Sequence, residues 1–105
     1  MRNLVDYLGR QIRLTEERRE HILSYPEMTG FQQIIEETLA DPERVIASNS
    51  DPSVHLYYRF LADTMVGEKW VCVVVKSISV DPFVRTAYLT DRPNRGVAQW
   101  PKPNA

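Results

Sequence analysis

The stretch Trp70–Lys76, which reads WVCVVVK, constrains the fold of this chain more than any other segment. Its residues are apolar and largely β-branched at consecutive positions, whereas a strand with one solvent-exposed face alternates apolar and polar side chains. Such a run is typical of a strand that is covered on both faces. We therefore expect a central strand here. Cys72, the single cysteine, is expected to be an inert core residue whose apolar setting raises the pKa of its thiol.

Strand patterns also flank this central segment. Val45–Ser48 predicts a short strand, and Phe83–Thr90 predicts the last strand. Val54–Leu61 alternates, with one face carrying Val54, Leu56, Tyr58 and Phe60 and the other carrying His55, Tyr57, Arg59 and Leu61. The connections at 63–69 and 77–82 are short enough for hairpins, so the four strands predict an antiparallel meander.

The first half of the chain has a helical period instead. Thr15 is suited to cap a helix over about 16–24, and Tyr25-Pro26 ends it because a residue before proline avoids the helical region. A second helix, from about 29–31 to Asp41-Pro42, is indicated by one stripe: Phe31, Ile34, Ile35, Thr38 and Leu39. A short strand is expected at Gln11–Leu14. The order predicts an α+β fold, in which an N-terminal short strand and two helices pack on a four-stranded antiparallel β-sheet whose other face stays partly open.

A chain of 105 residues is one domain, which we place at residues 1–91, followed by a proline-containing extended tail at 92–105. No apolar run approaches the roughly 18 residues of a membrane-spanning helix, and the first residues show no signal-peptide pattern. A single cysteine fits a reducing compartment. We therefore expect a cytoplasmic protein without a membrane partner.

The net charge of −1 hides an asymmetry along the chain. Residues 1–58 carry six arginines and ten acidic side chains, whereas residues 59–105 carry seven Lys or Arg and four acidic side chains. The second half is therefore suited to face a polyanion. Taken alone, the same cations more often belong to an ordinary solvated sheet face.

No motif with a fixed mechanism occurs in the sequence. It holds no phosphate loop, no HExxH, no GxSxG and no pair of cysteines. Its two histidines lie 34 residues apart, and together with one cysteine they do not predict a zinc site. We expect neither a metal nor a cofactor.

Polar side chains on the expected elements are the remaining candidates for a site. Arg18, His21 and Tyr25 project from one side of the first helix because they are three and four residues apart. The strands contribute Arg59, Lys76, Thr86 and Tyr88. Guanidinium groups bind phosphate oxygens, and a histidine moves protons near neutral pH. A lone helical histidine beside an apolar stripe is nevertheless more often a boundary residue, and Arg85 is suited to extend past the core into water.

Five pieces of the sequence resemble a known nuclease group in their order and spacing. They read IRLT…HI…PEM at 12–28, TLADPERV at 38–45, YYR at 57–59, VVVK at 73–76 and TAY at 86–88. Over roughly residues 8–96 the chain resembles small stand-alone phage and bacterial domains grouped with the barnase, EndoU, colicin and RelE-like nucleases. The resemblance implies N-terminal helices followed by a four-stranded antiparallel sheet.

The same resemblance implies a metal-independent endoribonuclease of the toxin or mobile-element type, in which the RNA 2′-hydroxyl attacks its own phosphodiester. Such a reaction needs an acid, a base and cations that stabilise the phosphorane. Carried onto this chain, the motifs make His21 the acid or base, Arg59 the phosphate clamp, and Thr86 and Tyr88 the orienting hydroxyls. The residues expected to bind the RNA backbone are Arg18, Tyr25, Lys76 and Arg85.

A catalytically silent protein-binding module on the same fold is the alternative. Its motivating features are the mild net charge, Tyr25, and a tail that carries Trp100 as an aromatic anchor. The protein partner would be an inhibitor or, through exposed strand edges, a second copy of the chain.

Overall fold

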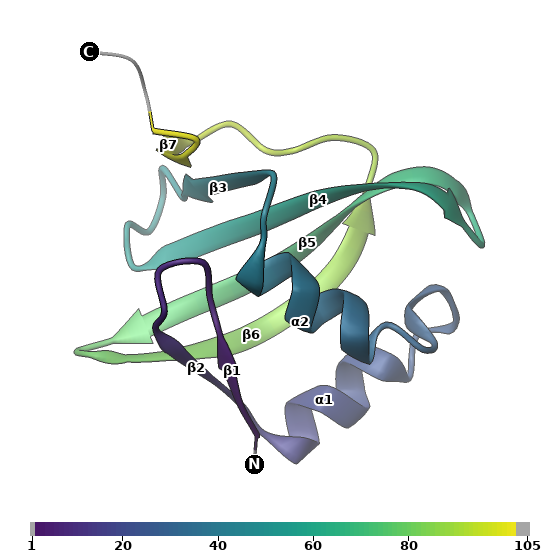
Figure 1. Cartoon of the computed structure of the whole chain (residues 1–105), viewed down its shortest axis with the longest axis horizontal. Coiled ribbons are helices and arrows are strands. Elements are labelled where there is room, and N and C mark those ends of the chain that lie inside the picture. Colours follow the sequence, from purple (N-terminus) through teal and green to yellow (C-terminus); the bar gives the residue numbers. More distant parts are fainter. Residues whose placement is uncertain (1, 103–105) are drawn as a thin grey trace.

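The computed structural model describes residues 2–102, so the last three residues of the predicted tail, 103–105, lie outside the described part. Figure 1 shows the chain, which folds into a curved sheet with two helices on one side. The elements are β1 (Arg2–Val5), β2 (Gln11–Leu14), α1 (Glu16–Leu23), the 3₁₀ turn η1 (Pro26–Met28), α2 (Gln32–Ala40), β3 (Arg44–Ala47), β4 (Val54–Thr64), β5 (Gly67–Ile78), β6 (Asp81–Thr90) and β7 (Val97–Trp100).

Both helices lie where the sequence places them. The hydroxyl of Thr15 accepts a hydrogen bond from the backbone N–H of Arg18 at 3.2 Å, which caps the first turn of α1. After Ser24 the backbone becomes extended at Tyr25, the residue before Pro26, as the proline requires.

Strand β5 is the centre of the sheet, as its apolar run predicts. Val71–Val75 are buried at every position. Strands β4 and β6 pair antiparallel with β5, and β3 pairs antiparallel with β4. The α+β class and the meander are therefore confirmed.

The sheet has more strands than the four that the sequence predicted. Within residues 2–102 the sheet has seven strands, in the order β1-β2-β6-β5-β4-β3-β7. The β1–β2 hairpin joins the edge of β6 through a parallel pairing of Arg13 with Phe83. Strand β7 comes from the tail and pairs with β3. Both β1 and β7 have only four residues, and all four residues of β7 are exposed, so no apolar alternation marks β7 in the sequence.

The central strands bury apolar side chains on both faces of the sheet. The larger core lies on the helix face, where Ile22 of α1 and Leu39 of α2 pack against residues such as Tyr57 and Val73. A smaller core on the outer face includes Tyr58 and Cys72. Residues 91–96 run along this outer face toward β7, and the N–H of Asn94 donates to the Tyr58 hydroxyl at 3.0 Å.

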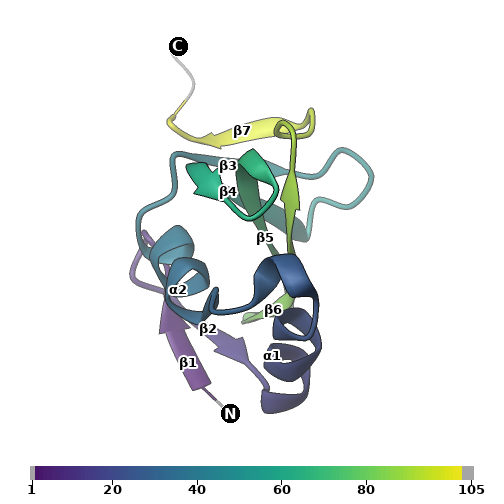
Figure 2. The same cartoon turned by 90° about the vertical axis from the view of Figure 1, so that its right-hand side faces the viewer.

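The sheet curls around α2, so that its two edges approach each other (Figure 2). Tyr7 lies in the turn that follows edge strand β1, and Trp100 lies on the opposite edge strand β7. Their ring centroids are 5.5 Å apart. The curl brings the β1–β2 turn against the helix face of β4, where Tyr7 meets the ring of Tyr57 at 5.9 Å.

No helix within residues 2–102 is long and apolar enough to cross a membrane.

Candidate functional site

The turn between β1 and β2 is organised by the buried carboxylate of Asp6. Its Oδ1 accepts the backbone N–H groups of Leu8 and Arg10 at 3.0 and 2.9 Å. Its Oδ2 accepts the Arg10 Nε–H at 3.0 Å and the Tyr57 hydroxyl at 2.8 Å. Gly9 closes the turn with a φ of +82°, a conformation that glycine adopts without strain. Asp6 therefore fixes the turn, orients Arg10 and ties both to Tyr57 of β4.

The Arg10 guanidinium is fixed by hydrogen bonds at two of its nitrogen atoms, and the side chain is partly exposed to solvent. Its Nη2 donates to the Tyr57 hydroxyl at 3.0 Å, while Asp6 binds its Nε. The side chain keeps 40% of its surface exposed, so part of the guanidinium remains available to a ligand. A guanidinium that is oriented before a ligand arrives loses less conformational entropy when it binds an oxyanion.

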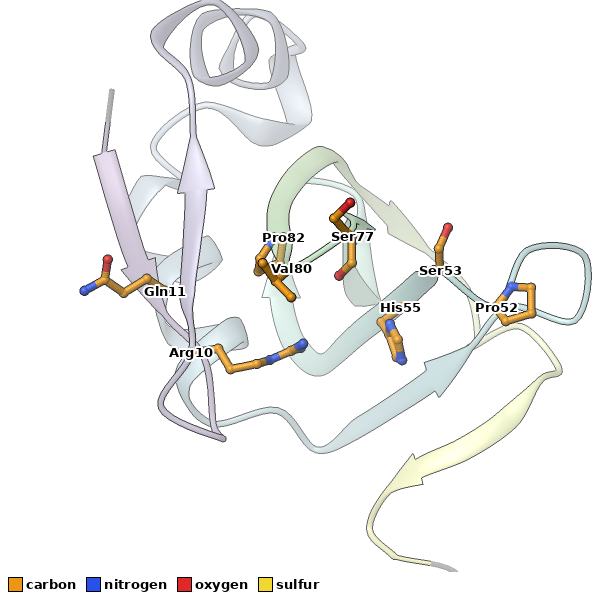
Figure 3. A pocket seen from close by; sticks show the side chains of 9 residues that line it. Arg10, Gln11, Pro52, Ser53, His55, Ser77, Val80 and Pro82 are labelled. Atoms are coloured by element: carbon orange, nitrogen blue, oxygen red, sulfur yellow. The ribbon is translucent and has the colours of Figure 1, made fainter.

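A cavity of about 680 Å³ lies beside Arg10, between the β1–β2 turn and the ends of β4, β5 and β6 (Figure 3). It exists because β2 and β6 pair at only one described position, Arg13 with Phe83, and are not paired ahead of it. Its lining combines polar and apolar side chains, namely Arg10, Gln11, Pro52, Ser53, His55, Ser77, Ser79, Val80 and Pro82. A concave site with a few convergent polar groups is typical of ligand-binding sites.

His55 is the titratable group of this cavity that is best placed for proton transfer. In Figure 3 its ring and the Arg10 guanidinium extend into the same space between β2 and β4. The Nδ1 atom of His55 is buried and has no hydrogen-bond partner within residues 2–102. Burial lowers the pKa of His55, the nearby Arg10 charge lowers it further, and Asp6 partly opposes both. The imidazole is therefore held in its neutral form, which accepts protons, near pH 7.

Serine side chains line the other wall of the cavity. The Ser53 hydroxyl donates to Asp51 at 2.6 Å, and Lys76 binds the same carboxylate at 3.0 Å. These bonds lower the pKa of Asp51 to about 2. Ser79 has a φ of +56°, which is uncommon for a residue with a side chain and occurs most often at turns and functional sites.

The residues expected to form the site on the first helix do not line the cavity: Arg18 and His21 lie on α1, and Tyr25 lies just after the end of α1 at Leu23. His21 is exposed, and its ring meets that of Tyr25 edge-on at 5.5 Å. Arg18 is exposed on the same helix. The contact between His21 and Tyr25 agrees with the spacing that the sequence indicated for these two residues.

The strand residues expected to form the site point to opposite faces of the sheet. Arg59 pairs with Val71, whose side chain belongs to the helix-face core, whereas Tyr88 pairs with Cys72 of the outer-face core. Adjacent residues of one strand project to opposite sides, so Arg59 cannot share a site with Tyr88. Thr86 lies on the outer face with Tyr88. Arg59 instead binds Asp41, at 3.2 Å to its carbonyl oxygen and 3.6 Å to its carboxylate.

The remaining expected residues are separate from one another. Lys76 pairs with Asp51 near the cavity wall, and Arg85 is exposed at a register shift between β5 and β6. Cys72 is fully buried, and burial raises the pKa of its thiol to about 11. That placement agrees with its predicted role as a core residue.

Arg10, Asp6 and His55 were not selected from the sequence, although one signal for them was present. The alternation of β4 places His55 and Tyr57 on the same face. What the sequence does not reveal is that the β1–β2 turn reaches that face, because the contact joins residues 51 positions apart. Within residues 2–102 no three His, Cys, Asp or Glu side chains gather in a way that could hold a metal ion.

No protein-family model, curated protein or solved structure matches this chain. The resemblance to the nuclease group therefore stays a prediction from the sequence.

Proposed function

We propose that this protein is a metal-independent endoribonuclease-like domain that binds the phosphodiester of RNA in the cavity between Arg10 and His55. The observation that carries the proposal is the arrangement of Arg10: a buried carboxylate and a tyrosine hydroxyl hold its guanidinium, which extends toward the neutral imidazole. The proposal keeps the chemistry that the sequence resemblance implies. It moves the centre from His21 on α1 to His55 on β4.

The two side chains have complementary roles in this chemistry. His55 accepts the proton of the RNA 2′-hydroxyl as its oxygen attacks phosphorus. Arg10 stabilises the negative charge of the phosphorane, and the leaving 5′-oxygen takes a proton from water. His55 then releases its proton to the solvent, where it neutralises the hydroxide left by that water. The products are a 2′,3′-cyclic phosphate and a free 5′-hydroxyl. A histidine with a lowered pKa is suited to this task because it is already deprotonated at neutral pH.

The chain offers a matched pair of variants, because it has two histidines, His21 and His55. Total RNA and a tRNA pool are incubated in EDTA with wild type, His55→Gln and His21→Gln. We expect discrete products from wild type and His21→Gln, and a loss of at least about a hundredfold in His55→Gln. Loss in His21→Gln alone would return the site to α1. No cleavage by the folded wild type would overturn the enzymatic proposal.

A second function is favoured by a different surface. An apolar cavity of about 450 Å³ lies between η1, α2 and the β4–β5 hairpin, and Met65 at its rim is 76% exposed. A catalytically silent binding module would use it to hold a second copy of the chain. Light scattering that shows a dimer, converted to a monomer by Met65→Asp, would support this function. A monomer in both samples would exclude the dimer.

A further inference from the structure

We propose that Trp100, supported by Tyr7, forms a stacking subsite for an unpaired RNA base beside the Arg10–His55 cavity. This inference rests on the proposed function and adds its substrate class, single-stranded RNA. The subsite belongs to strand β7, which the sequence shows only as part of a tail.

An uninterrupted series of contacts connects Trp100 to the phosphate-binding residue. The Trp100 ring lies 5.5 Å from that of Tyr7 at an angle of 45°, and Tyr7 meets Tyr57 edge-on at 5.9 Å. The Tyr57 hydroxyl accepts the Arg10 Nη2 hydrogen bond at 3.0 Å. The indole is thus separated from the guanidinium by two tyrosine side chains.

Strand register places Trp100 on the same face of the sheet as Tyr57 and His55. Val45 pairs with Tyr57 on one side and with Trp100 on the other, so these three residues form one row across β4, β3 and β7. The neighbouring row runs from His55 through Ala47 to Val97. Side chains of directly paired residues lie on the same side of a sheet. Trp100 and His55 therefore share the helix face of the sheet, one row apart.

Exposure of the indole indicates a binding role. Trp100 keeps 40% of its surface exposed although it is among the largest apolar side chains, and the exposed side chains of Leu8 and Val97 lie on the β1–β2 turn and on β7 itself. By contrast, Trp70, the other tryptophan, packs against the outer-face core and the ring of Phe60. A solvent-facing aromatic ring on the same face as a cationic group is the combination on which single-stranded nucleic acids stack their bases.

The geometry favours an unpaired strand over a duplex. A base offers its π-face to an aromatic side chain only when it is not stacked inside a helix. In addition, His55 and Trp100 lie on the face of the sheet that packs against α2, and the β1–β2 turn reaches the same face, so we expect this turn to hinder the approach of an RNA helix. A single strand can place one phosphate at Arg10 and turn a neighbouring base onto Trp100.

The test uses Trp70→Phe protein, in which Trp100 is the only fluorophore of its kind. The probes are a 2′-O-methyl RNA tetranucleotide, which cannot be cleaved, a longer 2′-O-methyl duplex that contains the same sequence, and ribose 5-phosphate, which has no base. We expect the single strand to quench Trp100 fluorescence, and the duplex and ribose 5-phosphate to leave it nearly unchanged. Replacing Trp100 by Leu keeps an apolar contact with Tyr7 but removes the π-face. We expect it to weaken tetranucleotide binding roughly tenfold.

Two further measurements separate the failure of this inference from failure of the proposed function. Binding of ribose 5-phosphate, followed by the NMR signal of His55, is expected to be lost in Arg10→Gln and to be unchanged in Trp100→Leu. Trp100→Phe is expected to restore most of the tetranucleotide affinity. Equal tetranucleotide affinity in wild type and Trp100→Leu, with dependence on Arg10 retained, would overturn the stacking subsite alone. Absence of binding by all probes would overturn both proposals.

Discussion

The hydroxyl of Tyr57 donates a hydrogen bond to the carboxylate of Asp6 at 2.8 Å, and both side chains are buried. This bond joins a turn at the start of the chain to the middle of β4. It also completes the support of Arg10, which binds both partners. The candidate site therefore depends on a long-range polar contact rather than on a local motif.

Replacing Tyr57 by Phe removes this support without changing the size of the core side chain. We expect the free energy of unfolding to fall by about 1–3 kcal/mol, because a buried carboxylate loses one hydrogen bond. Ribose 5-phosphate binding is expected to weaken as well, because Arg10 loses its second partner. Urea unfolding and NMR titration measure the two effects.

Tyr58→Phe is the matched control, because Tyr58 is equally buried but lies on the outer face and accepts a hydrogen bond from Asn94. It is expected to lower stability without affecting binding. Equal binding losses in the two variants would argue against a specific role for Tyr57.

The partly buried imidazole of His55, whose Nδ1 atom is fully buried, predicts a loss of stability in mild acid. Its pKa is lowered in the folded chain, chiefly by burial, from an ordinary value of 6.5. As the pH falls below 6.5, the unfolded chain takes up a proton that the folded chain still excludes, so stability is full above that pH and declines below it. Urea unfolding at pH 7 and pH 5 is expected to show a smaller decline in His55→Gln than in wild type. An identical decline in both proteins would contradict the burial of this group.

Cys72 is expected to be unreactive in the folded protein. Its thiol is fully buried, and a pKa raised from 9.0 to about 11 alone reduces the thiolate fraction by about a hundredfold. A water-soluble disulfide reagent should label it only in denaturant, with the rate following global unfolding. Rapid labelling of the native protein would show that the outer face opens.

Gly96 is expected to control the attachment of β7 to β3. A Cβ atom at this position would lie 2.5 Å from the carbonyl oxygen of Ala47 and would also overlap the side chain of Ile46. Gly96→Ala should therefore displace the strand and cost about 1–3 kcal/mol. In Trp70→Phe protein, fluorescence of Trp100 should shift to longer wavelength as the indole leaves Tyr7. An unchanged spectrum would mean that β7 tolerates the added methyl group.

The sequence predicts those elements of the fold that short-range patterns of residues determine. The apolar run of β5, the Thr15 cap and the proline after Tyr25 act over a few residues, and each predicts its element. Strand β7 lacks such a signal, because it attaches by backbone pairing with β3 and leaves its side chains exposed.

The site was less predictable for a related reason. Thr86 and Tyr88 were expected to act beside Arg59, but strand register places them on opposite faces. Register is set jointly by the hydrophobic patterns of the paired strands and by the geometry of the turns that join them, which the alternation within one strand does not reveal. Arg10 becomes a candidate only when Asp6 and Tyr57 are known to meet.

The two histidine side chains give the most direct test of the central claim. Their ring signals are followed by NMR while the 2′-O-methyl RNA tetranucleotide is added to wild-type protein at pH 7. The account predicts that the His55 signal shifts and that its pKa rises on binding, because a bound phosphate favours the protonated ring, while the His21 signal stays in place. A shift confined to His21, or no shift of either ring at saturating RNA, would contradict it.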